Sequence, residues 1–61
     1  METTTEQRPT SIEQWYDRSS RSWVTSLRDQ DGIEIDSLYD GTKADAAAAR
    51  RRFQRDIDEA K

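Results

Sequence analysis

The 61-residue sequence contains no histidine and no cysteine. Without imidazole or thiol groups, the chain cannot build the imidazole-dependent catalytic triads, a disulfide framework or a thiolate metal site. Pairs of carboxylates could still perform acid and base chemistry, but they need a concave and partly dry site, for which so short a chain has little room. We therefore expect a protein that is not an enzyme and has no catalytic residues, no metal and no cofactor.

Glycine and proline are also scarce, with two glycines and one proline. This excludes a glycine-rich phosphate-binding loop. The segment from Asp29 to Gly32 is similar to the start of a calcium loop, but its glycine comes two positions too early and the distant glutamate is missing. A turn is therefore favoured here.

No apolar run approaches the length of a transmembrane helix, and the first residues lack the basic start and apolar stretch of a signal peptide. We expect a soluble, cytoplasmic protein that does not contact membranes. The absence of cysteine fits a reducing compartment.

The net charge of -3 is unevenly distributed. Residues 11–41 carry seven acids and three bases, whereas residues 42–61 carry four acids and six bases. The middle of the chain is therefore acidic and its end is basic.

The order of residue types predicts one α+β domain. Residues 1–10 contain little to bury and are predicted to form a disordered tail. From Ile12 to Asp40, aromatic and β-branched residues alternate with polar ones, and polar turns interrupt them near residues 18–21 and 30–32. The sequence predicts a three-stranded antiparallel sheet followed by one helix (β-β-β-α), spanning residues 11–61.

Side-chain alternation sets the predicted register of the first hairpin. A loop at Ser19-Ser20, or a longer one over residues 18–21, leads to the same alternation. The predicted pairs are Ile12 with Leu27, Gln14 with Thr25 and Tyr16 with Trp23.

For the second hairpin, a two-residue Asp31-Gly32 loop would pair Leu27 with Asp36 and place acids among core residues, so we reject it. A three-residue loop with Gly32 in the left-handed conformation avoids this. It predicts that Leu27 pairs with Ile35, Trp23 with Tyr39 and Asp29 with Ile33. The inner face is then predicted to contain Ile12, Tyr16, Trp23, Leu27, Ile33, Ile35 and Tyr39.

A helix is predicted to begin after Gly41, with Thr42 as the N-cap and Asp45 three residues later. Its apolar stripe is predicted to cover one face of the sheet. The stripe consists of Ala46, Ala49, Phe53, Ile57 and Ala60.

One helix cannot cover both faces, so the same alternation leaves a row of apolar side chains on the outer face. Such a row on an open sheet is typical of a binding or self-association site. The alternative is a small cross-strand cluster that only stabilises the sheet. We predict a partner-binding surface with Trp15 as its anchor, formed by Trp15, Val24 and Leu38 with Arg28, Glu34 and Asp36 at its rim.

The one basic cluster lies on the predicted helix, at Arg50, Arg51, Arg52 and Arg55. It could contact an anion or a nucleic acid. However, the four side chains spread widely around the helix, and pairs such as Arg52 with Asp56 could neutralise them at four-residue spacing, as could Arg55 with Glu59. A solvated helix face is favoured.

The predicted order of elements over residues 11–60 resembles the layout of AP2-type domains and of integrase arm-binding N-terminal domains. These families read DNA with an open sheet face, so the resemblance implies a DNA-binding sheet. The charge here differs, because Arg28 stands among acids that would repel a duplex. These acids are Glu13, Asp17, Glu34 and Asp36.

The leading hypothesis is therefore a non-catalytic protein-interaction domain that uses the open sheet face to bind a protein or a second copy of itself. A small acidic chain of this kind fits a regulator or accessory factor of a phage or other mobile element. The alternative is a DNA-binding accessory protein that uses the arginine-rich helix.

Overall fold

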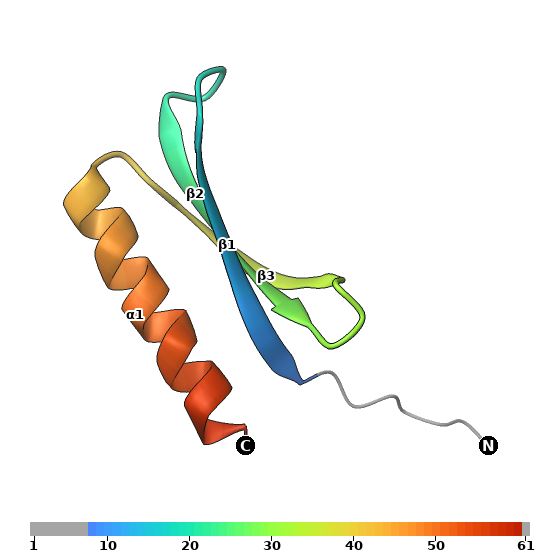
Figure 1. The fold of residues 1–61 in the computed structure, drawn as a ribbon. Coiled ribbons are helices and arrows are strands. Elements are labelled where there is room, and N and C mark those ends of the chain that lie inside the picture. The colour runs from blue at the N-terminus through green and yellow to red at the C-terminus, as the bar shows by residue number, and fades with distance from the viewer. Residues whose placement is uncertain (1–7, 61) are drawn as a thin grey trace.

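The computed structural model describes residues 8–60. Three antiparallel strands are followed by one helix, and the sheet order is β1-β2-β3. The helix lies along one face of the twisted sheet (Figure 1), which confirms the predicted α+β, β-β-β-α architecture. The elements are β1 (Pro9–Asp17), β2 (Ser22–Asp29), β3 (Glu34–Asp40) and α1 (Lys43–Glu59).

Strand β1 starts at Pro9, two residues before the predicted start of the domain. The remainder of the predicted tail, residues 1–7, and the last residue, Lys61, lie outside the described residues. In the described part of the chain, no helix is both long and apolar enough to cross a membrane.

The hairpin of β1 and β2 has the predicted register, in which Ile12 pairs with Leu27 and Tyr16 with Trp23. The connection is the longer of the two loops considered, residues 18–21, and its last residue, Arg21, has a positive φ of 54°. At the start of this loop, the Asp17 carboxylate accepts hydrogen bonds from the loop serines. A local polar network therefore closes the hairpin.

The loop between β2 and β3 has the predicted three-residue form. Gly32 has a φ of 81°, and the Asp29 amide donates to the carbonyl of Ile33 at 3.0 Å. The buried Asp29 carboxylate accepts from the amides of Asp31 and Ile33, both at 2.9 Å. One aspartate side chain thus fixes both ends of the turn.

Beyond this loop, the predicted register is wrong by one residue because β3 contains a bulge. Arg28 pairs with Glu34, but Leu27 pairs with Asp36, so Ile35 is an extra residue without an opposite partner. An extra residue reverses the direction of every side chain after it. The predicted pairs of Leu27 with Ile35 and of Trp23 with Tyr39 are therefore incorrect. Asp36, Leu38 and Asp40 instead share the inner face with Leu27, Thr25 and Trp23.

The core lies between the inner face and α1. Leu27, Phe53 and Ile57 are buried together, and Ile12 and Leu38 pack against them while half-buried. The helix has the predicted cap, because Thr42 Oγ1 accepts from the Asp45 amide at 3.1 Å. Its buried side chains are four of the five predicted ones, Ala46, Ala49, Phe53 and Ile57.

The predicted inner face is only partly correct. Ile12 and Leu27 contribute to the core as expected. Tyr16 and Ile33 are exposed, and the bulge moves Tyr39 to the outer face.

Candidate functional site

The feature that stands out on the outer face is a row of three side chains across the sheet. Trp15 of β1 pairs with Val24 of β2, which pairs with Tyr39 of β3, so all three point away from α1. Trp15 is 41% exposed and Tyr39 is 62% exposed, whereas Val24 is only 2% exposed. Because α1 lies on the other face, Val24 can be covered only by neighbouring side chains of the sheet among residues 8–60. We call Trp15, Val24 and Tyr39 the aromatic row.

The structure corrects two of the predicted site residues. Leu38 does not lie on the outer face, because it pairs with Thr25 and packs against the core. Asp36 pairs with Leu27, so it belongs to the inner side of β3, where it is exposed. Val24 has the predicted direction, but it is buried rather than open to a partner. The bulge at Ile35 accounts for both changes of face, and Tyr39 takes the place predicted for Leu38.

Toward the loop between β2 and β3, the outer face becomes polar. There Arg28 Nε lies 3.6 Å from Glu13 Oε1, and Arg28 Nη1 donates to the Gly32 carbonyl at 3.1 Å. The fully buried Ser26 hydroxyl donates to Glu34 Oε1 at 2.8 Å. Arg28 and Glu34 therefore lie on the outer face as predicted, in a polar half whose members are already bonded to each other.

Two more aromatic side chains lie at the other end of the sheet, on its inner face. The rings of Tyr16 and Trp23 meet edge to face, with centroids 5.5 Å apart and an angle of 67° between the planes. The tip of this hairpin extends past the first turn of α1 (Figure 1), so the helix does not cover this part of the inner face. The exposed Tyr16 is therefore a useful comparison for Trp15, its neighbour in sequence.

The tip of the same hairpin carries Arg18 and Arg21, both exposed. Asp17 lies beside them, but its carboxylate is engaged with serines. The hydroxyl and amide of Ser19 and the hydroxyl of Ser20 donate to it and hold its pKa below the ordinary value of 3.8. The two guanidinium groups make no ion pair within residues 8–60.

The arginine cluster lies on the exposed part of α1. The predicted ion pairs of Arg52 with Asp56 and of Arg55 with Glu59 are absent from the part of the chain that the structure describes. The last turn of the helix carries three acids, Asp56, Asp58 and Glu59, but none of them forms an ion pair with the cluster. All four members, Arg50, Arg51, Arg52 and Arg55, are exposed.

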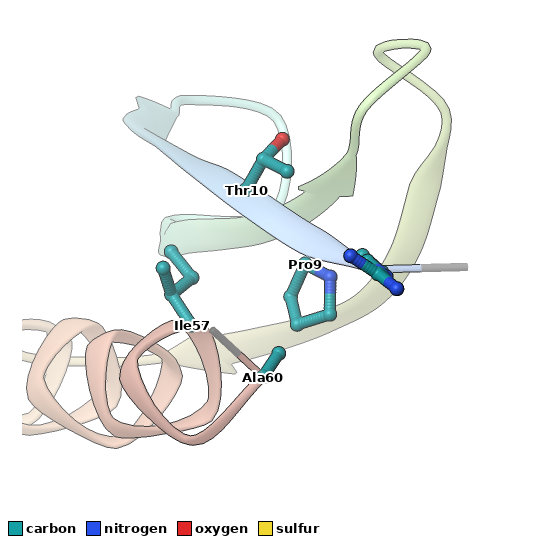
Figure 2. A pocket seen from close by; sticks show the side chains of 5 residues that line it. Pro9, Thr10, Ile57 and Ala60 are labelled. Atoms are coloured by element: carbon teal, nitrogen blue, oxygen red, sulfur yellow. The ribbon is translucent and has the colours of Figure 1, made fainter. Parts of the chain in front are cut away.

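A hollow of about 230 Å³ lies where the start of β1 meets the end of α1 (Figure 2). It is smaller than typical ligand pockets, which hold roughly 300–1,000 Å³. Its lining is mostly apolar and contains Arg8, Pro9, Thr10, Ile57 and Ala60. Among the described residues, no group of three or more acids is placed to hold a metal ion.

Sequence reasoning missed Tyr39 as an outer-face residue. The available signal was the rejected pairing of Leu27 with Asp36, which the structure contains. The pairing is tolerated because β3 is an edge strand and the Asp36 side chain stays in solvent.

Comparisons of this chain with protein-family models, with curated proteins and with solved structures find no match.

Proposed function

We propose that this chain is a non-catalytic interaction domain that binds a protein partner through the aromatic row. The observation that carries the proposal is the exposure of Trp15 and Tyr39, on either side of Val24, on a face that α1 does not cover. In this reading the domain acts in the cytoplasm as a regulator or accessory factor of a phage or other mobile element. Its small size and acidic middle support that role.

The geometry of the row suits a contact surface. Val24 lies between Trp15 and Tyr39 and is buried, so the two aromatic side chains supply the exposed area of the row. Aromatic side chains that combine a large apolar area with few rotatable bonds dominate binding energy at protein interfaces. Trp15 is the expected anchor because the tryptophan ring offers the larger apolar area.

The test compares Trp15→Ala with Tyr16→Ala, two exposed aromatic positions on opposite faces of one strand. These two variants and Tyr39→Ala are immobilised beside the unmodified chain, and the proteins that each captures from a cell extract are quantified. We expect Trp15→Ala and Tyr39→Ala to lose the captured partner, while Tyr16→Ala keeps it. Circular dichroism establishes that each variant is folded.

Equal capture by folded Trp15→Ala, Tyr39→Ala and unmodified protein would contradict the proposal. Equal loss in all three variants would also contradict it, because the effect would not depend on the outer face.

One observation supports a second candidate function, DNA binding through α1. The four arginines of the cluster have no ion-pair partner within residues 8–60. If they contact phosphates, binding falls steeply as salt rises, because each contact releases counterions. A gel-shift titration measures this slope, and the Arg51→Glu variant should reduce it. The absence of any shift at low salt would remove this candidate.

A further inference from the structure

The charge that the strands place on the outer face is mostly acidic. Arg18 and Arg21 lie in the loop beyond the last strand pair, so the pairing assigns their side chains to neither face. Within the strands, three acids stand against a single base on this face, which gives it a negative net charge. These four residues are Glu13 and Asp17 of β1, Arg28 of β2 and Glu34 of β3.

Two of these acids have no basic partner within residues 8–60. Arg28 Nε lies 3.6 Å from Glu13 Oε1, so these two charges compensate each other. Glu34 accepts from the Ser26 hydroxyl, and Asp17 accepts from an amide and two hydroxyls of the loop serines. Such neutral donors stabilise a carboxylate without cancelling its charge. They also lower the pKa of Asp17, which keeps this carboxylate ionised at neutral pH.

Asp17 is the uncompensated acid nearest the aromatic row. It follows Trp15 by two residues on the same face of β1, a separation of roughly 7 Å. A carboxylate offers about four acceptor sites. At Asp17, hydrogen bonds from the loop serines occupy three of them. A donor that lies over the Trp15 ring can therefore reach the remaining site.

The Trp15 ring itself suits a cation. It is 41% exposed and lies beside the buried Val24. Among aromatic side chains, tryptophan attracts a cation over its ring most strongly. The neighbouring carboxylate adds to this attraction, because both groups act on the same positive charge.

We propose, building on the function above, that the protein partner places an arginine on the aromatic row. Its guanidinium stacks on Trp15 and donates a hydrogen bond to Asp17. Arginine suits this position better than lysine, because its planar group stacks on a ring while the N–H donors at its edge stay available. Glu34 attracts further basic residues of the same segment. The acids that repel a nucleic acid from this face thus favour a basic protein segment.

A short peptide tests this contact directly. The probe is the capped pentapeptide Gly-Gly-Arg-Gly-Gly, and its control carries citrulline, which has nearly the same shape but no charge. Millimolar peptide is added, and the indole N–H signals are followed by NMR. The signal that Trp15→Ala lacks belongs to Trp15, and Trp23 on the inner face is the internal reference. We expect the arginine peptide to shift the Trp15 signal and the citrulline peptide to bind roughly three- to thirtyfold more weakly.

Two charge variants then locate the carboxylate. Asp17→Asn and Asp36→Asn each remove one negative charge, but Asp36 belongs to the inner side of β3. Asp17→Asn should bind the arginine peptide roughly two- to fivefold more weakly than the unmodified chain. Asp36→Asn should bind it as the unmodified chain does. Circular dichroism melts establish that both variants are folded.

The outcomes separate the arginine contact from the proposed function. An unshifted Trp15 signal, or equal binding of the two peptides, overturns the arginine contact, whereas Trp15-dependent capture of a protein would leave the proposed function intact. A shift confined to Trp23 overturns the location on the outer face. Equal binding by the two charge variants overturns the contact with Asp17.

Discussion

Gln14 makes a connection that can be tested by substitution. Its side-chain amide donates to Thr25 Oγ1 at 2.9 Å and to the Ala46 carbonyl at 2.8 Å, so one side chain joins β1, β2 and α1. Thr25 is completely buried, and water cannot replace the lost partner without a rearrangement. A net hydrogen bond contributes about 1 kcal/mol, and a buried group left unpaired adds a desolvation cost. Gln14→Ala should therefore reduce the free energy of unfolding by about 2–3 kcal/mol.

In a domain of this size, each kcal/mol lowers Tm by roughly 4–8 °C, so thermal melts followed by circular dichroism should show a decrease of roughly 10–20 °C. The matched control is Gln54→Ala. Gln54 makes a single exposed bond of 3.2 Å to Asp58 on the same helix. Such a pair is worth roughly 0.2–0.5 kcal/mol, and alanine favours the helix, so little change is expected.

A second variant, Gln14→Glu, keeps the size of the side chain but replaces the amide donor with acceptors. At neutral pH, its carboxylate would face the Ala46 carbonyl. This raises the folded-state pKa of the new side chain, so the loss of stability relative to the unmodified chain should shrink as pH falls through that pKa. If Gln14→Ala melts within error of Gln54→Ala, or if Gln14→Glu is as stable as the unmodified chain at neutral pH, the connection contributes nothing and the reasoning fails.

Two further predictions concern the loops. Gly32→Ala should reduce the free energy of unfolding in urea by about 1–2 kcal/mol, because φ is positive at this position. Crowding does not contribute, since no atom lies within 4 Å of the added methyl group. Gly41→Ala, which is equally uncrowded and has no positive φ, should leave stability unchanged or raise it by up to about 1 kcal/mol, and equal losses at both sites would refute the conformational explanation. Hydrogen bonds from Ser19 and Ser20 lower the pKa of Asp17 in the folded state. They therefore stabilise the fold at pH values above the unfolded-state pKa of Asp17, and this stabilisation is lost as the pH falls through its folded-state pKa. The Ser19 amide signal in NMR should therefore titrate below pH 3.8, and a midpoint at or above that value would contradict the network.

Rules that depend on a few neighbouring residues predicted much of this fold. Thr42 after Gly41, with Asp45 three residues later, marked the helix start, and Gly32 after two polar residues marked a turn that needs positive φ. The alternation on either side of residues 18–21 gave the register of the first hairpin, whichever loop length applied. The helix cap follows from local chemistry alone. The length of the second loop was chosen because the shorter loop would pair Leu27 with Asp36, and the structure contains that pairing together with the longer loop.

The bulge at Ile35 was outside the reach of such rules. Alternation is a two-state property, so a single extra residue changes the face of every later side chain in β3. An aspartate on the inner side of β3 was expected to be costly, but the edge position of the strand leaves the Asp36 carboxylate in water. The candidate site therefore lost Leu38 and gained Tyr39. The loop was predicted correctly, and the error arose within the strand that follows it.

The polar centre of β2 lies between the apolar core and the aromatic row. Thr25 and Ser26 are both fully buried on opposite faces, and each is bonded to a side chain of a neighbouring strand, Gln14 or Glu34. The core of Leu27 lies on one side of this pair, whereas the aromatic row lies toward the hairpin tip and does not contribute to that core. Because Trp15 is not a member of the Leu27 core, its replacement should remove the proposed binding surface while the domain remains folded.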